Sequence, residues 1–140
     1  MRIEYQDGYY EGEVNAFKEK HGAGRYVWND GTYYEGEWQK DKRSGVGLMH
    51  YTDGEYKGEW KDDALNGYGV LNSSEGWTYA GEFQNGKFGK LGKLVWADGT
   101  YYEGEWLDGE RTGIGKETFQ GGRYEGEFLN GKWHGIGKVA

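Results

Sequence analysis

The chain has 140 residues, a formal net charge of −7, no cysteine and a mean hydropathy of −1.04. These values exclude disulfides and thiolate metal sites, and they disfavour binding to nucleic acid, which positive fields attract. An aromatic content of 18% is too high for a disordered chain, whereas 35% hydrophobic residues are too few for a thick core. We therefore expect a thin fold held by aromatic rings.

A five-residue motif, Tyr-x-Gly-x-aromatic, recurs along the whole chain. In chain order its copies begin at Tyr10, Tyr34, Tyr56, Tyr79, Tyr102 and Tyr124. Successive copies lie 24, 22, 23, 23 and 22 residues apart, a period too short for a pair of helices and suited to one β-hairpin. The first copy is degenerate, because Val14 replaces the aromatic residue. This pattern predicts a single domain over residues 1–140 made of six tandem repeats.

Two further motifs divide each repeat into strands. A Gly-x-Gly motif follows every copy except the fourth, where Lys90 and Gly92 stand in its place. Asp-Gly or a related pair, such as Asp30-Gly31, marks the end of most repeats and is typical of tight turns. Each repeat is therefore predicted to be a strand, a loop of six or seven residues, a second strand and a tight turn. The predicted fold is all-β, an elongated, twisted, single-layer antiparallel meander of tandem β-hairpins.

Alternation along the first strand of each repeat predicts which side chains share a face. Tyr, Gly and the aromatic residue point to one side, and the intervening residues, usually Glu, point to the other. Setting this motif opposite Gly-x-Gly places large rings over glycines. The same register sets Glu11 opposite Arg25, Glu35 opposite Leu48, Glu103 opposite Lys116 and Glu125 opposite Lys138. Gly36→Val should then unfold the array, whereas Glu37→Gln should be nearly silent.

The three motifs at this spacing resemble the MORN (membrane occupation and recognition nexus) repeat over essentially the whole chain. The best copy is the segment from Tyr34 to Trp38, followed by Gly45-Val46-Gly47 and Asp53-Gly54. The resemblance implies an aromatic-lined groove, no catalytic residue, and a role in recognition and assembly. Family members include scaffolds of the cytoskeleton and modules attached to larger proteins, among them lipid kinases.

Catalytic and metal-binding interpretations are weak. The three histidines, His21, His50 and His134, fall in different positions of different repeats, so no cluster is expected. Pairs such as Glu103 and Glu105 recur in four repeats, which favours a structural surface pattern over a two-carboxylate hydrolase site. We expect neither an enzyme nor a cofactor.

The expected function is protein–protein interaction or scaffolding through the aromatic face. The residues predicted to form the partner groove are Tyr56, Trp60, Tyr79, Phe83, Tyr102 and Trp106, because a one-layer sheet should leave some rings partly exposed. The expected partner is another protein or an amphipathic peptide segment, with no role for nucleic acid.

Three further expectations concern the surface and setting of the molecule. An alternative function is peripheral contact with acidic phospholipid through a basic loop edge at Lys40, Lys42 and Arg43; another is a regulatory domain of a larger protein. Open terminal strands favour a homodimer, with Phe128, Trp133 and Ile136 as its candidate edge. The N-terminus opens no apolar signal segment, so we expect a cytoplasmic protein, associated with the cytoskeleton or a membrane.

Overall fold

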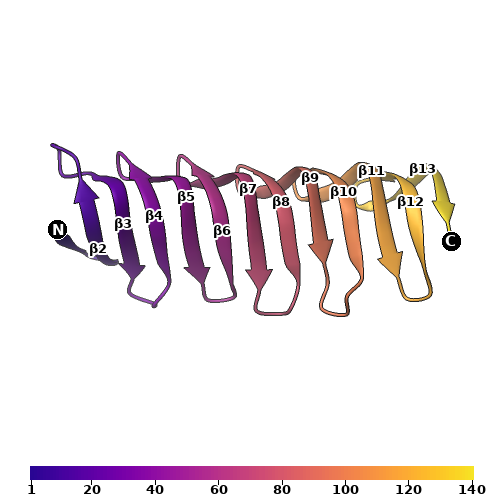
Figure 1. The fold of residues 1–140 in the computed structure, drawn as a ribbon, viewed down its shortest axis with the longest axis horizontal. Coiled ribbons are helices and arrows are strands. Elements are labelled where there is room, and N and C mark those ends of the chain that lie inside the picture. Colours follow the sequence, from indigo (N-terminus) through magenta and orange to yellow (C-terminus); the bar gives the residue numbers. More distant parts are fainter.

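The computed structural model describes residues 1–140 as one open sheet of 13 antiparallel strands, each paired with its neighbours in the sequence. The sheet is elongated, with the two termini at opposite ends (Figure 1). The strands are β1 (Arg2–Tyr5), β2 (Gly8–Val14), β3 (Lys20–Trp28), β4 (Tyr33–Gln39), β5 (Lys42–Tyr51), β6 (Gly54–Lys61), β7 (Ala64–Ser73), β8 (Thr78–Gln84), β9 (Lys87–Val95), β10 (Tyr101–Leu107), β11 (Glu110–Phe119), β12 (Gly122–Leu129) and β13 (Lys132–Val139). The structure has no helix of the length and hydropathy needed to cross a membrane. The predicted antiparallel meander is confirmed.

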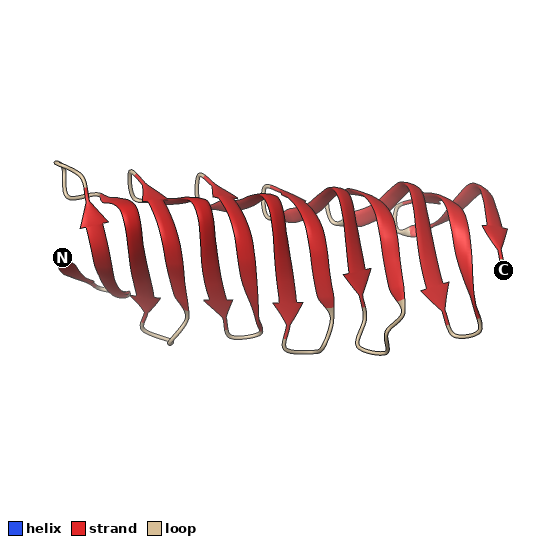
Figure 2. Cartoon of the chain, in the orientation of Figure 1, coloured by secondary structure: helices blue, strands red, loops and turns tan.

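The connections fall along the two long edges of the sheet (Figure 2). One edge carries the Asp-Gly connections between repeats, and the other carries the turns within repeats. The prediction of six- or seven-residue loops within repeats is wrong. In the first repeat five residues separate Val14 from Lys20, and in the second β4 ends at Gln39 and β5 begins at Lys42. The intervening Lys40 and Asp41 have φ of 47° and 68°, the backbone of a two-residue type I′ turn. Strand pairing therefore continues almost to the hairpin tip.

The predicted register is confirmed, and it contains a β-bulge in each repeat. Gly36 pairs with Gly47, but Trp38 then pairs with Arg43, so β5 contributes two extra residues. The bulged segment contains Gly45, which has a left-handed φ of 61°. Because a bulge bends and twists a strand, six bulges in line curl the sheet, and Figure 1 shows one long edge folded over. The motif rings are buried, which places the aromatic side inside the curl. We call the aromatic side the inner face and the opposite side the outer face.

The core is a single row of rings seated on glycines. The six motif tyrosines are between 0% and 4% exposed. A Cβ atom added to Gly47 would lie 2.1 Å from the Tyr34 hydroxyl oxygen, so no other residue fits beneath that ring. The Tyr34 hydroxyl donates to the Glu37 carbonyl oxygen at 2.8 Å, which satisfies its polar end at the bulge. Ring, glycine and bulge thus form one unit that repeats along the array.

Substitutions should distinguish the glycines that lie against a facing strand from the glycines that occur only in turns. A Cβ on Gly104 would lie 2.5 Å from the Cα of Gly115 and 2.6 Å from the Ile114 carbonyl oxygen. Gly104→Val, like Gly36→Val, should therefore lower the free energy of unfolding by more than about 3 kcal/mol. Gly109→Asp is the control, because a Cβ there meets nothing within 4 Å. Urea denaturation followed by circular dichroism would contradict the packing if both classes of substitution had equal effects.

The fourth repeat offers the opposite test, since a lysine occupies its left-handed bulge position. Lys90 has φ of 57°, where the other repeats have glycine. A side chain in this conformation costs about 1 kcal/mol, so Lys90→Gly should raise the free energy of unfolding by about that amount. Lys57→Gly, in the extended backbone of β6, should lower it. A loss of stability on Lys90→Gly in thermal melts would show that the bulge does not depend on glycine.

Candidate interaction groove

The aromatic side chains interlock along the inner face from one repeat to the next. The Tyr34 ring makes edge-to-face contacts with Trp38 of its own repeat at 5.0 Å and with Trp60 of the following repeat at 5.2 Å. The Trp60 indole N–H also donates back to the Gly47 carbonyl oxygen at 3.2 Å. Edge-to-face pairs contribute about 0.5–1.5 kcal/mol each beyond their buried area. The rings therefore join neighbouring repeats.

The six residues predicted to form the partner groove belong to this packed row. Tyr56, Trp60, Tyr79, Phe83, Tyr102 and Trp106 are at most 5% exposed. The expectation that some of them stay partly exposed is wrong, because the bulges curl the single layer around its own rings. These residues build the floor beneath the inner face, and binding of a partner above that floor stays a prediction.

The inner surface that solvent reaches is made by the second strand of each repeat and the connections that follow it, together with Val14 at the end of β2. Half-buried apolar side chains pack there against the ring row: Val14, Trp28, Tyr51, Leu65, Leu71, Trp77, Phe88, Leu94, Trp96 and Phe119. They vary from repeat to repeat, so no recurrent motif marks them in the sequence. Alternation along β5, β7 and β9 could have placed Tyr51, Leu71 and Leu94 on this face.

The inner face has two hollows of different character. The first, of about 300 Å³, lies near the N-terminal end and already contains basic side chains. The Lys20 ammonium lies 4.9 Å from the centre of the Tyr5 ring and 3.4 Å from Asp41. The Arg43 guanidinium lies 4.7 Å from the centre of the Trp60 ring and pairs with Asp63 at 2.9 Å. This hollow is therefore internally satisfied by cation–π contacts and ion pairs.

The second hollow, of about 240 Å³, lies in the middle of the array. Its wall contains four apolar side chains and two carboxylates but no lysine or arginine. The nine residues are Tyr51, Asp53, Gly54, Leu65, Leu71, Asn72, Ser73, Glu75 and Trp77. We call it the central hollow. An apolar surface with a rim of uncompensated negative charge suits an apolar side chain that has a basic neighbour.

The predicted lipid edge is only partly formed. Lys40 and Lys42 are exposed at the hairpin tip, where Asp62 lies beside them in a shallow hollow. Arg43 points to the inner face instead, where it binds Asp63 and Trp60. Its guanidinium is thus engaged inside the array, which leaves two of the three basic groups at the edge.

The predicted dimer edge is also divided. Phe128 is 2% exposed and belongs to the ring row, whereas Trp133 and Ile136 are 47% and 85% exposed. Both lie on β13, which pairs with β12 on one side only. Self-association stays a prediction that rests on Trp133 and Ile136.

The histidines lie apart in the structure, each with local contacts. The His21 imidazole accepts the Lys40 backbone N–H at 3.3 Å, and His50 stacks on Tyr33 at 5.1 Å. His134 pairs with Glu127 in the strand register. No group of three or more His, Cys, Asp or Glu side chains is placed to hold a metal ion.

Comparison with known proteins identifies the repeat. The family model for the MORN repeat matches residues 10–33, 34–55, 56–78, 79–101, 102–122 and 124–139. The chain belongs to the MORN-repeat family. MORN repeats are modules that bind proteins and membrane lipids, and domains built from them are typically non-catalytic.

A relative of this MORN-repeat chain is phosphatidylinositol 4-phosphate 5-kinase 1 of Oryza sativa subsp. japonica, 52% identical over 31 residues. The match covers 22% of this chain and 4% of the kinase. The shared stretch consists of MORN sequence and carries no evidence of catalysis.

The buried tyrosines should make the MORN array lose stability at alkaline pH. Burial raises the pKa of Tyr10 and of Tyr102 to about 12, and it raises the pKa of Tyr34, Tyr56 and Tyr79 as well. Their stabilisation is complete below the unfolded pKa of about 10 and is lost as the pH rises toward the folded values. The melting temperature should hold up to about pH 10 and fall above it. The part of the tyrosinate absorbance that belongs to the buried rings should appear together with unfolding, after that of exposed tyrosines such as Tyr68. Ionisation of all 13 tyrosines before unfolding would contradict the burial of the rings.

Proposed function

We propose that the chain is a non-catalytic protein–protein interaction module whose inner face binds an amphipathic peptide segment of a partner. The observation that supports this proposal is the central hollow. Leu71 and Trp77 offer it an apolar surface, while Asp53 and Glu75 supply acidic groups. In protein interfaces a few apolar anchors carry most of the affinity, and charges at the rim select the partner.

The proposed ligand has one bulky apolar residue with lysine or arginine close to it in sequence. The apolar residue enters the central hollow and covers Leu65, Leu71 and Trp77. Its basic neighbours reach Asp53 and Glu75, which form no ion pair within the chain. The ring row beneath keeps the floor rigid, so little ordering accompanies binding.

Peptide binding tests the central hollow directly. Fluorescently labelled peptides with a central phenylalanine between arginines would be compared with versions that carry serine in place of phenylalanine or glutamate in place of arginine. Only the first should bind, and Trp77→Ala should weaken it by about tenfold or more. Glu75→Lys should weaken binding of the peptide that carries arginine, because it replaces an acidic group of the hollow with a basic one.

Two control variants separate this result from a general loss of structure. Tyr68→Ala removes a ring that is 64% exposed on the outer face, and Glu35→Lys reverses a charge there. Both should bind the first peptide as the wild type does. Equal binding by Trp77→Ala and the wild type, with both folded by circular dichroism, would refute the proposed site.

A membrane-contact function and a regulatory role within a larger protein are the alternatives. The membrane alternative rests on Lys40 and Lys42 and on the kinase match. It predicts salt-dependent binding to phosphatidylserine vesicles that disappears in the Lys40→Gln, Lys42→Gln double variant. The acidic net charge of −7 and the inward position of Arg43 favour the protein ligand. The proposed setting is cytoplasmic, with association to the cytoskeleton or a membrane through the partner.

A further inference from the structure

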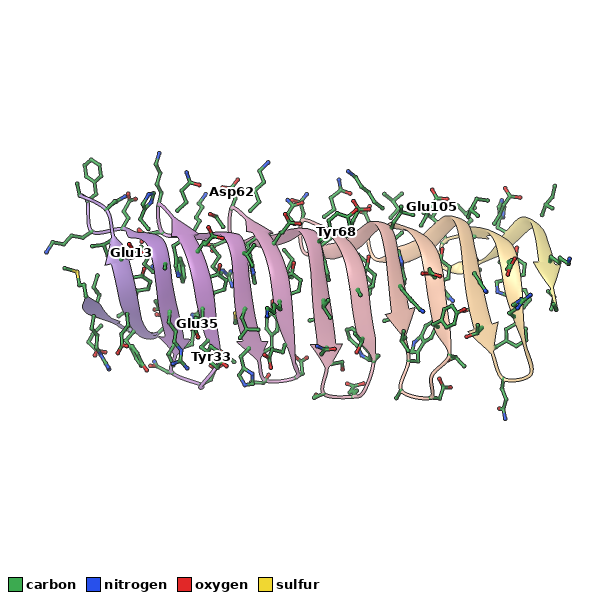
Figure 3. The ribbon with its side chains drawn as sticks, in the orientation of Figure 1. Glu13, Tyr33, Glu35, Asp62, Tyr68 and Glu105 are labelled. Atoms are coloured by element: carbon green, nitrogen blue, oxygen red, sulfur yellow. The ribbon has the colours of Figure 1, made fainter.

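The outer face carries an alternating stripe of glutamates and apolar side chains that the inner groove does not use. It contains one residue from each strand between β4 and β13. In spatial order these are Glu37, Val46, Glu59, Tyr68, Glu82, Leu91, Glu105, Ile114, Glu127 and Ile136. We call this row the outer stripe. Figure 3 shows two of its members, Tyr68 and Glu105, toward the edge that carries the turns within repeats.

Adjacency along the outer stripe follows from the strand register and from hydrogen bonds. Leu91 lies opposite Glu105, and Ile114 lies opposite Glu127. The Ile114 backbone N–H donates to the Glu105 carboxylate at 2.6 Å, and the Ile136 N–H donates to Glu127 at 2.7 Å. The same bond joins Val46 to Glu37, Tyr68 to Glu59 and Leu91 to Glu82. Neighbouring members are therefore one strand spacing apart, about 4.8 Å.

The glutamates of the stripe have a structural role that the sequence did not reveal. The left-handed residue of each bulge leaves the following N–H without a strand partner, and the glutamate carboxylate accepts it. Glu37 accepts the Val46 N–H at 2.6 Å, and because glutamine keeps an acceptor oxygen, a small effect of Glu37→Gln stays a prediction. None of these glutamates forms an ion pair with a lysine or arginine. The nearest basic side chains of the same face, Lys93, Lys116 and Lys138, lie opposite Glu103 and Glu125 rather than opposite the glutamates of the stripe.

The apolar members of the stripe have no role within the fold. The bulge needs only their backbone, and their side chains point to solvent with exposures between 55% and 85%. The first repeat has Ala23 at this position, which shows that a small side chain suffices. β-propensity favours Val, Tyr and Ile in a strand, but it does not account for Leu107 and Leu129, which are 58% and 45% exposed beside the stripe. The equivalent residues of the three preceding repeats are Gln39, Lys61 and Gln84.

The C-terminal half of the outer face thus presents exposed apolar side chains that alternate with carboxylates. Its members are Leu91, Leu107, Ile114, Leu129 and Ile136, with Glu105 and Glu127 between them. An exposed apolar patch of this kind marks an interaction surface. The carboxylates oppose binding to an anionic lipid surface and favour a basic partner. Lys87 and Lys132 belong to the same face but lie at the turn edge.

We propose that the outer stripe binds a basic amphipathic helix whose contact seam alternates apolar and basic residues. Along a helix, residues that alternate at three- and four-residue steps advance about 5.2 Å per step, which is close to the spacing of the strands. Leucine side chains then lie on Leu91, Ile114 and Ile136. Arginine side chains lie on Glu105 and Glu127. This surface is opposite the inner face and independent of the proposed function.

A designed peptide of three heptads tests the outer stripe, with leucine at each a position and arginine at each d position. Titration of the labelled peptide should show binding to the wild type and a loss of about tenfold or more in the Leu91→Ser, Ile114→Ser double variant. Both substitutions fall on exposed side chains, so the fold is retained. Trp77→Ala, on the inner face, should leave this affinity unchanged.

The charge of the peptide separates the electrostatic part from the apolar part. Replacing arginine with glutamate in the peptide should abolish binding. Glu105→Gln with Glu127→Gln should weaken the arginine peptide and leave a glutamine version unaffected, because glutamine keeps an acceptor for the bulge N–H. The proposal would be overturned if the Leu91→Ser, Ile114→Ser double variant bound the arginine peptide as tightly as the wild type does. The proposal would also be overturned if the wild type bound phosphatidylserine vesicles and the Leu91→Ser, Ile114→Ser double variant did not.

Discussion

The contact between a tyrosine ring and a glycine of the facing strand is the constraint from which the shape of the array follows. A ring can lie against the backbone of Gly47 only because no Cβ is present, and a second glycine at Gly36 allows the two strands to approach closely. The ring reaches the bulge and ties its hydroxyl to the Glu37 carbonyl group. Each such unit bends the sheet in the same sense, so a single layer can bury its rings without a second layer. The fold thereby dispenses with the thick apolar core that its composition could not provide.

This arrangement divides the sequence into parts that maintain the fold and parts that are free to vary. The motif tyrosines, the glycines and the bulge glutamates maintain it, and their contacts are nearly the same in all six repeats. The second strands carry the variation on the inner face: Lys20 and Arg43 fill the first hollow, whereas Leu65 and Leu71 line the central one. On the outer face the variable position lies between the two glycines of Gly-x-Gly. Both proposed binding surfaces therefore rely on residues that no repeat motif defines.

The period and the glycine positions predicted the meander, the register and the ring packing because these depend on backbone spacing alone. Glu11 does pair with Arg25, and Glu103 with Lys116. The exposure of Trp60 and Trp106 was predicted wrongly, since the extent of the curl depends on left-handed bulge residues such as Gly45, which the motifs did not reveal. The short turns at Lys40 and Asp41 were missed for a related reason: pairing resumes beyond the bulge. The role of Glu37 could not be predicted without knowing that the Val46 N–H lacks a strand partner.

The indole N–H bonds between neighbouring repeats are unevenly distributed, and this has a mechanical consequence. Trp38, Trp60 and Trp106 each donate to a glycine carbonyl of the preceding repeat. Phe83 and Phe128 occupy the equivalent positions and have no donor to offer. The β7–β8 junction has instead one exposed side-chain bond, from the Thr78 hydroxyl to Asn72 at 2.9 Å. Three side-chain bonds cross from the fifth repeat to the sixth, made by Arg111, Lys116 and Trp133. An array under tension or bending should therefore yield at the β7–β8 junction before it yields at the β11–β12 junction.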